Sequence, residues 1–357
     1  MQIGIPRALS YYNFYPFWYG FFTDLGIKIV LSDPTTKQTL ASGSLLVVSE
    51  TCLPIKVYVG HVLNLLDKGV DKIFAPSIQS IAHKIYNCSK IRGLPDLISN
   101  VVKRDFILID ATLDKSEKQQ GLYDFLTEAV KPFGITDAKR IREASKNGWK
   151  VYNNFQVMTR SGVPFNLALK SAIDNKVIIA SQQKTYPINV AVIAHGYNLY
   201  DDKASMKILD KLEKLDVKAY TAEQLSQEQM QEGISSMGAQ LYWANEYEIT
   251  GAAAHYIQDE KVDGIITINA FGCGPDSMML ERVARYAKNE NKPFLNLSID
   301  EHTGEAGFVT RIEAFVDMLF RKKRSKIINS VDMKDDIELG IQTPEEIHLR
   351  IMNSIKD

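Results

Sequence analysis

Residues 262–287 contain an apolar run, a glycine-bracketed turn and an amphipathic stretch, in that order. The run 262–270 predicts a buried strand, and 278–287 has the apolar spacing of a helix. Cys273 lies between two glycines, just before Pro275, and proline is well suited to the first turn of a helix. A strand that leads directly into a helix is the repeating unit of α/β proteins, so this segment narrows the possible folds sharply.

The same alternation of apolar runs and helical stretches recurs along most of the chain. The expected strands are 2–5, 27–31, 45–48, 70–76, 106–110, 188–194, 217–220, 262–270 and 293–297. Between the two groups of strands, the spacing predicts helices at about 116–131, 136–155 and 164–175. We therefore predict two parallel-sheet α/β domains, 1–114 and 187–308, with a helical segment at 115–186 between them. The remainder, 309–357, is expected to hold C-terminal helices and a charged tail.

An aromatic segment near the N-terminus places nine aromatic residues within positions 11–22. Its expected form is a helix that begins near Pro16 and ends at Gly26, buried on more than one side. A core helix or a subunit contact is the favoured interpretation, and an aromatic ligand box is the alternative.

The charge and cysteine content exclude several classes of protein. A formal net charge of −1 gives no basis for binding nucleic acid or an anionic membrane surface. The first residues lack the pattern of a signal peptide, and no run reaches the roughly 18 apolar residues of a membrane span. Three widely separated cysteines do not form a disulfide framework, so a reducing cytoplasm is the expected compartment.

Each of the three cysteines falls at or after the expected carboxyl end of a strand. Cys52 and Cys273 also precede proline-led helices, where the helix dipole favours the thiolate, and Cys88 lies in a loop. The alternative is that they are ordinary structural cysteines. Three thiolates at one site would suit an iron–sulfur cluster, zinc or copper(I), and a [4Fe–4S] cluster held by three cysteines leaves one iron without a protein ligand.

Other candidate site residues have two open interpretations each. Glu50 and Ser277 are candidate catalytic residues because each is close in sequence to a cysteine, and Glu50 could instead be a solvated charge. The segment Asp300-Glu301-His302 could bind a hard metal or act in acid–base chemistry, or it could cap the following segment.

The histidines are weaker candidates. His195 and His83 lie in loops at strand ends and could be site residues or ordinary hydrogen-bonding side chains. His61 lies on an expected helix and is predicted to be a surface or packing residue.

Several motifs together resemble the acyl-CoA dehydratase activase-related family, over residues 1 to about 320. They are IGIPRAL at 3–9, ETCLPIK at 50–56, GLPD at 93–96, FGCGPDS at 271–277 and DEHTGEAG at 300–307. This family is similar to the subunits of 2-hydroxyacyl-CoA dehydratases and benzoyl-CoA reductases and to double-cubane cluster proteins. Members tend to have Cys-Pro-Lys at the second cysteine, where this chain has Cys88-Ser89-Lys90.

The resemblance implies two flavodoxin-like α/β domains with a [4Fe–4S] cluster in the cleft between them, held by Cys52, Cys88 and Cys273. It also implies a separate ATP-hydrolysing activase that supplies low-potential electrons, since no such domain precedes Met1. The substrate would be a small molecule, with an acyl-CoA as the best-known example, and the chain could form a homo- or heterodimer.

Three functions remain open from the sequence. The first is an iron–sulfur dehydratase or low-potential reductase. The second is a cluster-carrying protein that transfers electrons or builds metal sites without its own turnover. The third is a nucleotide- or sugar-binding α/β module with incidental cysteines.

Overall fold

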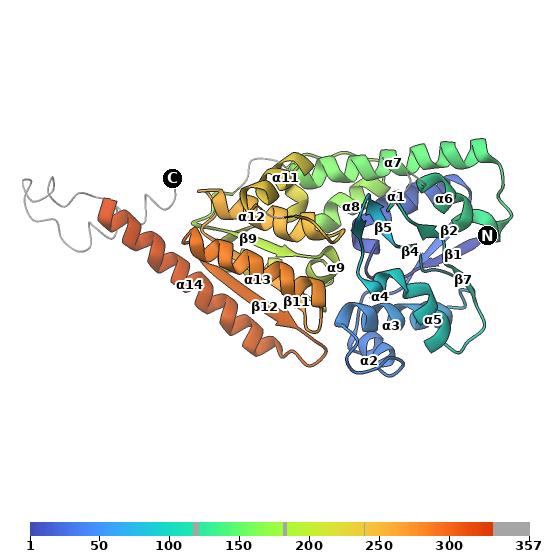
Figure 1. Ribbon diagram of the computed structural model, residues 1–357, viewed down its shortest axis with the longest axis horizontal. Coiled ribbons are helices and arrows are strands. Elements are labelled where there is room, and N and C mark those ends of the chain that lie inside the picture. The colour runs from blue at the N-terminus through green and yellow to red at the C-terminus, as the bar shows by residue number, and fades with distance from the viewer. Residues whose placement is uncertain (117–120, 181–183, 239, 331–357) are drawn as a thin grey trace, which may run out of the picture.

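The computed structural model describes residues 1–116, 121–180, 184–238 and 240–330. The expected charged tail beyond 330 lies outside these residues. The described part forms two lobes placed side by side (Figure 1), a first lobe up to residue 180 and a second lobe from residue 184. No helix in these ranges combines the length and the apolar character needed to cross a membrane.

Each lobe is built on a four-stranded parallel sheet with the same strand order. In the first lobe the order is β2 (Lys28–Leu31), β1 (Gln2–Ile5), β3 (Lys72–Phe74), β7 (Ile107–Ile109). In the second lobe it is β10 (Val217–Tyr220), β9 (Ile188–Ala194), β11 (Gly264–Ala270), β12 (Phe294–Ile299). Both match the first four strands of the flavodoxin-like order. The α/β prediction is therefore confirmed.

Helices cover both faces of each sheet, because alternate strand residues point to opposite sides. In the second sheet, Val190 and Val192 pack with α10 (Ile208–Lys214) and α14 (Glu305–Ser330). Ala191 and Ile193 pack on the other face with α12 (Ala252–Gln258) and α13 (Gly274–Asn289). The strands of this lobe are thus buried on both faces, which explains their continuous apolar runs.

The first lobe follows the same plan. On one face α1 (Tyr11–Asp24) packs on the sheet, and on the other lie α3 (Leu53–Asp67) and α5 (Leu94–Val101). The middle segment supplies α6 (Leu122–Val130), α7 (Ala138–Arg160) and α8 (Phe165–Ile173), and these helices share one hydrophobic cluster with α1. The segment therefore belongs to the packing of the first lobe. The domain limits themselves remain a prediction.

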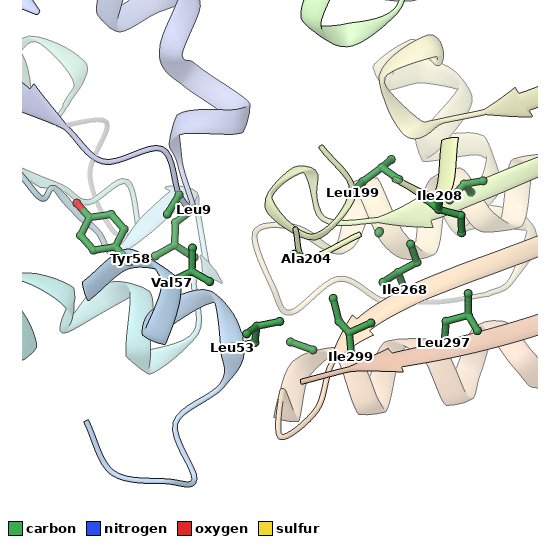
Figure 2. Close-up of a cluster of buried hydrophobic side chains, with 14 of the residues drawn as sticks. Leu9, Leu53, Val57, Tyr58, Leu199, Ala204, Ile208, Ile268, Leu297 and Ile299 are labelled. Carbon is green, nitrogen blue, oxygen red and sulfur yellow. The ribbon is translucent and has the colours of Figure 1, made fainter. Parts of the chain in front are cut away.

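An apolar contact joins the two lobes. Figure 2 shows Leu53 of α3 pointing toward Ile299, at the end of β12, and both belong to a single buried cluster that includes residues of each lobe. Strands of both sheets run toward this boundary (Figure 1). The loops that follow the strands, where parallel sheets carry their sites, therefore meet between the lobes.

Two predicted elements differ in the structure. The aromatic helix begins at Tyr11, and Pro16 lies inside it. The predicted strand 45–48 is wrong, because these residues form turns after α2 (Lys37–Ser44), with Leu45 84% and Val48 70% exposed. A run of four apolar residues is consistent with a strand but does not establish one, because the pattern does not show whether a partner strand is available.

Candidate functional site

All three cysteines occupy the same local position, the residue just before the first turn of a helix. Cys52 precedes α3, Cys88 precedes the short helix α4 (Ser89–Arg92) and Cys273 precedes α13. In each case the cysteine backbone is extended, and all three thiols are free and half-buried. The prediction had placed Cys88 in a loop without a following helix, and in the structure a hairpin, β5 (Ser80–Ala82) with β6 (Ile85–Tyr86), precedes it.

The three loops that carry these cysteines meet around one carbonyl group. The carbonyl oxygen of Glu50 accepts a hydrogen bond from Lys90 Nζ at 3.5 Å. It also lies 3.8 Å from the position that a Cβ atom on Gly272 would take. Because Glu50, Lys90 and Gly272 are each within two residues of a cysteine, this contact places the three loops together at the boundary between the lobes.

The electrostatic environment of the thiols agrees with that placement. Burial raises the pKa of Cys52, and the charge of Cys88 raises it further, although Lys90 acts in the opposite direction. Burial also raises the pKa of Cys273, with added contributions from Asp276, Cys52 and Cys88. For these two cysteines, the loss of solvation therefore outweighs any stabilisation of the thiolate by the helix dipole.

The three candidate ligands are all cysteines, so sulfur is the only donor atom that they supply. Within the described ranges, no three His, Cys, Asp or Glu side chains lie close enough together to bind a single metal ion. A cubane cluster makes a different demand, because it separates the ligand sulfurs by roughly 6–7 Å. Three half-buried thiols from loops that meet fit that demand better than they fit a mononuclear zinc site.

The two candidate catalytic residues are placed beside the cysteines but are already engaged. The Glu50 carboxylate is exposed, and hydrogen bonds from its own backbone N–H and from the Ser49 hydroxyl lower its pKa. The Ser277 hydroxyl donates to the carbonyl oxygen of Cys273 at 2.8 Å, within the first turn of α13. The catalytic roles of both residues remain predictions.

A buried pair that the sequence did not indicate lies behind Cys273. His195 Nε2 and Asp276 Oδ1 are 2.7 Å apart, and both side chains are almost completely buried. Burial lowers the pKa of His195, but the charge and hydrogen bond of Asp276 outweigh it and leave the pKa raised. Tyr197 stacks on the His195 ring, and the charges of Asp276 and of all three cysteines contribute to its raised pKa, after burial. Of these residues, sequence reasoning named only His195 as a candidate.

The segment 300–302 has a structural role in this chain. Asp300 accepts hydrogen bonds from the His302 backbone N–H and the Thr303 hydroxyl, which is the capping interpretation. Glu301 reaches across to the first lobe and forms an ion pair with the buried Lys56. Lys56 also donates to the Ser49 carbonyl at 2.8 Å, so this pair supports the loop that carries Cys52.

The other two candidate histidines, His83 and His61, have hydrogen-bond partners other than the cysteines. His83 is on the exposed hairpin, with its Nδ1 2.7 Å from the carbonyl oxygen of Ser116. His61 is fully buried, with Nε2 2.9 Å from the Thr35 hydroxyl, and burial lowers its pKa to about 3. His61 is therefore a packing residue rather than a surface residue.

The fold and the thiols define a class: a two-lobed α/β protein with three half-buried cysteines at helix N-termini near the lobe boundary. Residues 2–225 match the family described as CoA enzyme activase uncharacterised domain. Residues 204–319 match the 2-hydroxyglutaryl-CoA dehydratase D-component. The chain belongs to this acyl-CoA dehydratase activase-related family, as its motifs predicted. A search of curated proteins gives no significant match.

Proposed function

We propose that this chain is the cluster-bearing component of a 2-hydroxyacyl-CoA dehydratase-type system. Cys52, Cys88 and Cys273 would hold a [4Fe–4S] cluster. The observation that carries the proposal is the meeting of their three loops at the Glu50 carbonyl oxygen. The matched families support it, since one is described by an activase and the other by a dehydratase component.

When bound, such a cluster would supply low-potential one-electron chemistry at an iron that has no protein ligand. The chain's own residues provide the surroundings. Lys90 lies beside the Cys52 loop, and its charge favours the anionic form of Cys52, which is the form that binds iron. On the side of the second lobe, Tyr197 and the His195–Asp276 pair lie close enough for the charges of Asp276 and the three cysteines to act on Tyr197.

The partner proposed for this component is a separate ATP-hydrolysing activase, and the proposed substrate class is an acyl-CoA. The proposed compartment is a reducing cytoplasm, because all three cysteines are unpaired.

Anaerobic reconstitution tests the cluster. The wild-type chain is expected to bind about four iron and four sulfide per chain, and Cys273→Ser to lose most of that iron, because a serine hydroxyl is a poor ligand for soft iron–sulfur centres. Ser277→Ala, one helical turn away, is the matched control and is expected to keep the iron. Equal iron in the wild type and Cys273→Ser would show that the cluster proposal is wrong.

A further inference from the structure

A cavity of about 530 Å³ lies at the lobe boundary, between the helices α1 and α7 and the segment 222–248 of the second lobe. Its volume is within the range of small-molecule sites. Aromatic side chains from α1 and α7 dominate its wall, among them Tyr12, Phe14, Trp18, Trp149, Tyr152 and Phe155. Helix α1 therefore packs in the core of the first lobe and also forms one side of an aromatic chamber. A core helix and an aromatic ligand box are thus compatible interpretations of this segment.

Two carboxyl groups face this chamber. Glu248 lies on a π-helical turn, Tyr247–Gly251, and accepts a hydrogen bond from Asn13 Nδ2 at 2.8 Å. Glu223 accepts one from the Tyr200 hydroxyl at 2.6 Å. π-Helical turns occur frequently at functional sites.

Within the described ranges neither carboxyl forms an ion pair, although the charge of His195 acts on Glu248 and favours its carboxylate. The basic side chains that line the same chamber, Lys115 and Arg160, are exposed, and neither forms an ion pair with Glu223 or Glu248. Burial raises the pKa of Glu248 to about 7, and the charge of Glu223 contributes to the rise. The two carboxylates therefore repel each other, and His195, which is already paired with Asp276, does not line the chamber between them.

The chamber also adjoins the cysteine region. A smaller cavity of about 90 Å³ shares Asn13, Phe14, Ala244 and Glu248 with it. The far side of that smaller cavity is lined by Asn87, the neighbour of Cys88, and by Tyr197. The two cavities are therefore neighbours, and Glu248 lines both of them.

We propose that this chamber binds an organic ammonium ion with an apolar or aromatic body. The ammonium group would lie between Glu223 and Glu248 and neutralise their charges, and the aromatic wall would hold the body and contribute cation–π attraction. A neutral molecule would leave the two carboxylates without a counter-charge, and an anion would be repelled. This inference goes beyond the proposed function and does not depend on a bound cluster.

Calorimetric titration of the metal-free chain at pH 8 tests the ligand class. The probes are 2-phenylethylamine, 2-phenylethanol and 3-phenylpropanoate, which share a similar body and differ in charge. The amine is expected to bind at least about tenfold more tightly than the alcohol, since a hydrogen bond to a charged group contributes about 1.5–3 kcal/mol. No binding is expected for the acid. Failure of the amine to bind, or equal binding of amine and alcohol, would overturn the proposal.

Variants locate the site. Glu248→Gln keeps the size of the side chain and is expected to weaken amine binding about tenfold or more, with alcohol binding unchanged. Glu232→Gln, on the exposed side of α11 (Gln227–Ser236), is the matched control and is expected to bind like the wild type. Tyr152→Leu provides a second test, because it removes a ring face and should weaken the amine more than the alcohol. If neither Glu248→Gln nor Tyr152→Leu changes the affinity for the amine, the amine binds elsewhere and the proposal is wrong.

The two proposals can fail separately. Cys273→Ser should bind 2-phenylethylamine as the wild type does, because the chamber lies beyond the smaller cavity and includes no cysteine. Loss of iron without loss of amine binding would therefore separate the cysteine site from the chamber.

Discussion

Glu248 is the residue whose ionisation should affect the stability of this chain most visibly. Its pKa is about 7 in the folded chain, compared with an ordinary value of 4.5, because burial and the charge of Glu223 disfavour the carboxylate. Between these two values the folded chain binds more protons than the unfolded chain. The folded state therefore loses stability as the pH rises from 4.5 to 7, and no further loss is expected above 7.

Replacing Glu248 with glutamine should remove that loss. The free energy of unfolding of Glu248→Gln, relative to the wild type, should increase between pH 4.5 and 7 by on the order of 2–3 kcal/mol. Urea unfolding at four pH values from 5 to 8 measures the difference. Glu232→Gln should show no such trend, and a difference that stays constant with pH would refute the assignment to Glu248.

At the scale of single residues, the sequence indicated the cysteines but not their neighbours. Cysteine is rare in this chain, so three of them drew attention by their position after apolar runs. Asp276 and Glu248 were not singled out, because a carboxylate on an amphipathic helix is usually solvated. Only the folded chain brings His195 to Asp276, and Glu223 to the same chamber as Glu248.

At the scale of elements, the contact between α2 and α3 shows how closely two helices approach. A Cβ atom on Gly60 would lie 1.9 Å from the Thr39 carbonyl oxygen, and one on Gly43 would lie 2.0 Å from the Lys56 carbonyl oxygen. No side chain fits at either position, so the two glycines fix the position of α2 on α3. Since α3 begins just after Cys52, this contact also fixes the direction of the Cys52 loop.

Gly60→Ala should therefore destabilise the chain by about 2 kcal/mol or more. The added methyl group would overlap the carbonyl carbon and oxygen of Thr39, which belong to the backbone and cannot move aside. Gly307→Ala is the matched control, since Gly307 is exposed in α14 with no atom near the added methyl group. It should stabilise the chain by roughly 0.5–1 kcal/mol through helix propensity. Thermal unfolding of the two variants measures both changes in stability. If the two substitutions change stability by similar amounts, the close approach of α2 and α3 is contradicted.

Elements with long apolar patterns were predicted well, and short ones were not. The strands predicted at 188–194 and 262–270 correspond to β9 and β11, because buried parallel strands have continuous apolar runs. The run 45–48 has the same residue types, yet its residues form turns and two of them are largely exposed. Local pattern alone does not show whether another strand is available as a partner.

At the scale of the whole molecule, the Lys56–Glu301 ion pair joins the two lobes next to the apolar contact of Leu53. Lys56 is 2% exposed and Glu301 22% exposed, so the pair is largely removed from water. Burial raises the pKa of Glu301, but the hydrogen bond from Lys56, a backbone hydrogen bond and the charges of Lys56 and His302 together outweigh burial and leave the pKa lowered. Sequence analysis could not find this pair, since its two members lie 245 positions apart.

Glu301→Gln should lower the free energy of unfolding by about 1–3 kcal/mol, because it leaves the buried Lys56 ammonium without its counter-charge. Glu281→Gln removes the exposed pair with Arg285 and should change stability by less than about 0.5 kcal/mol. Urea denaturation at pH 7 compares the two. If both substitutions lower the free energy of unfolding by the same amount, the ion pair between the lobes stabilises the chain no more than an exposed ion pair does.

The division of the cysteines between the lobes has a mechanical consequence. Cys52 and Cys88 come from one lobe and Cys273 from the other, so any group bound by all three is also a cross-link. Closing a loop of roughly 220 residues in this way would remove on the order of 5 kcal/mol of chain entropy from the unfolded state. Limited proteolysis should then cleave the iron-free chain faster than the reconstituted chain. If the cluster proposed above is bound by these three cysteines, its loss would also remove this cross-link between the lobes.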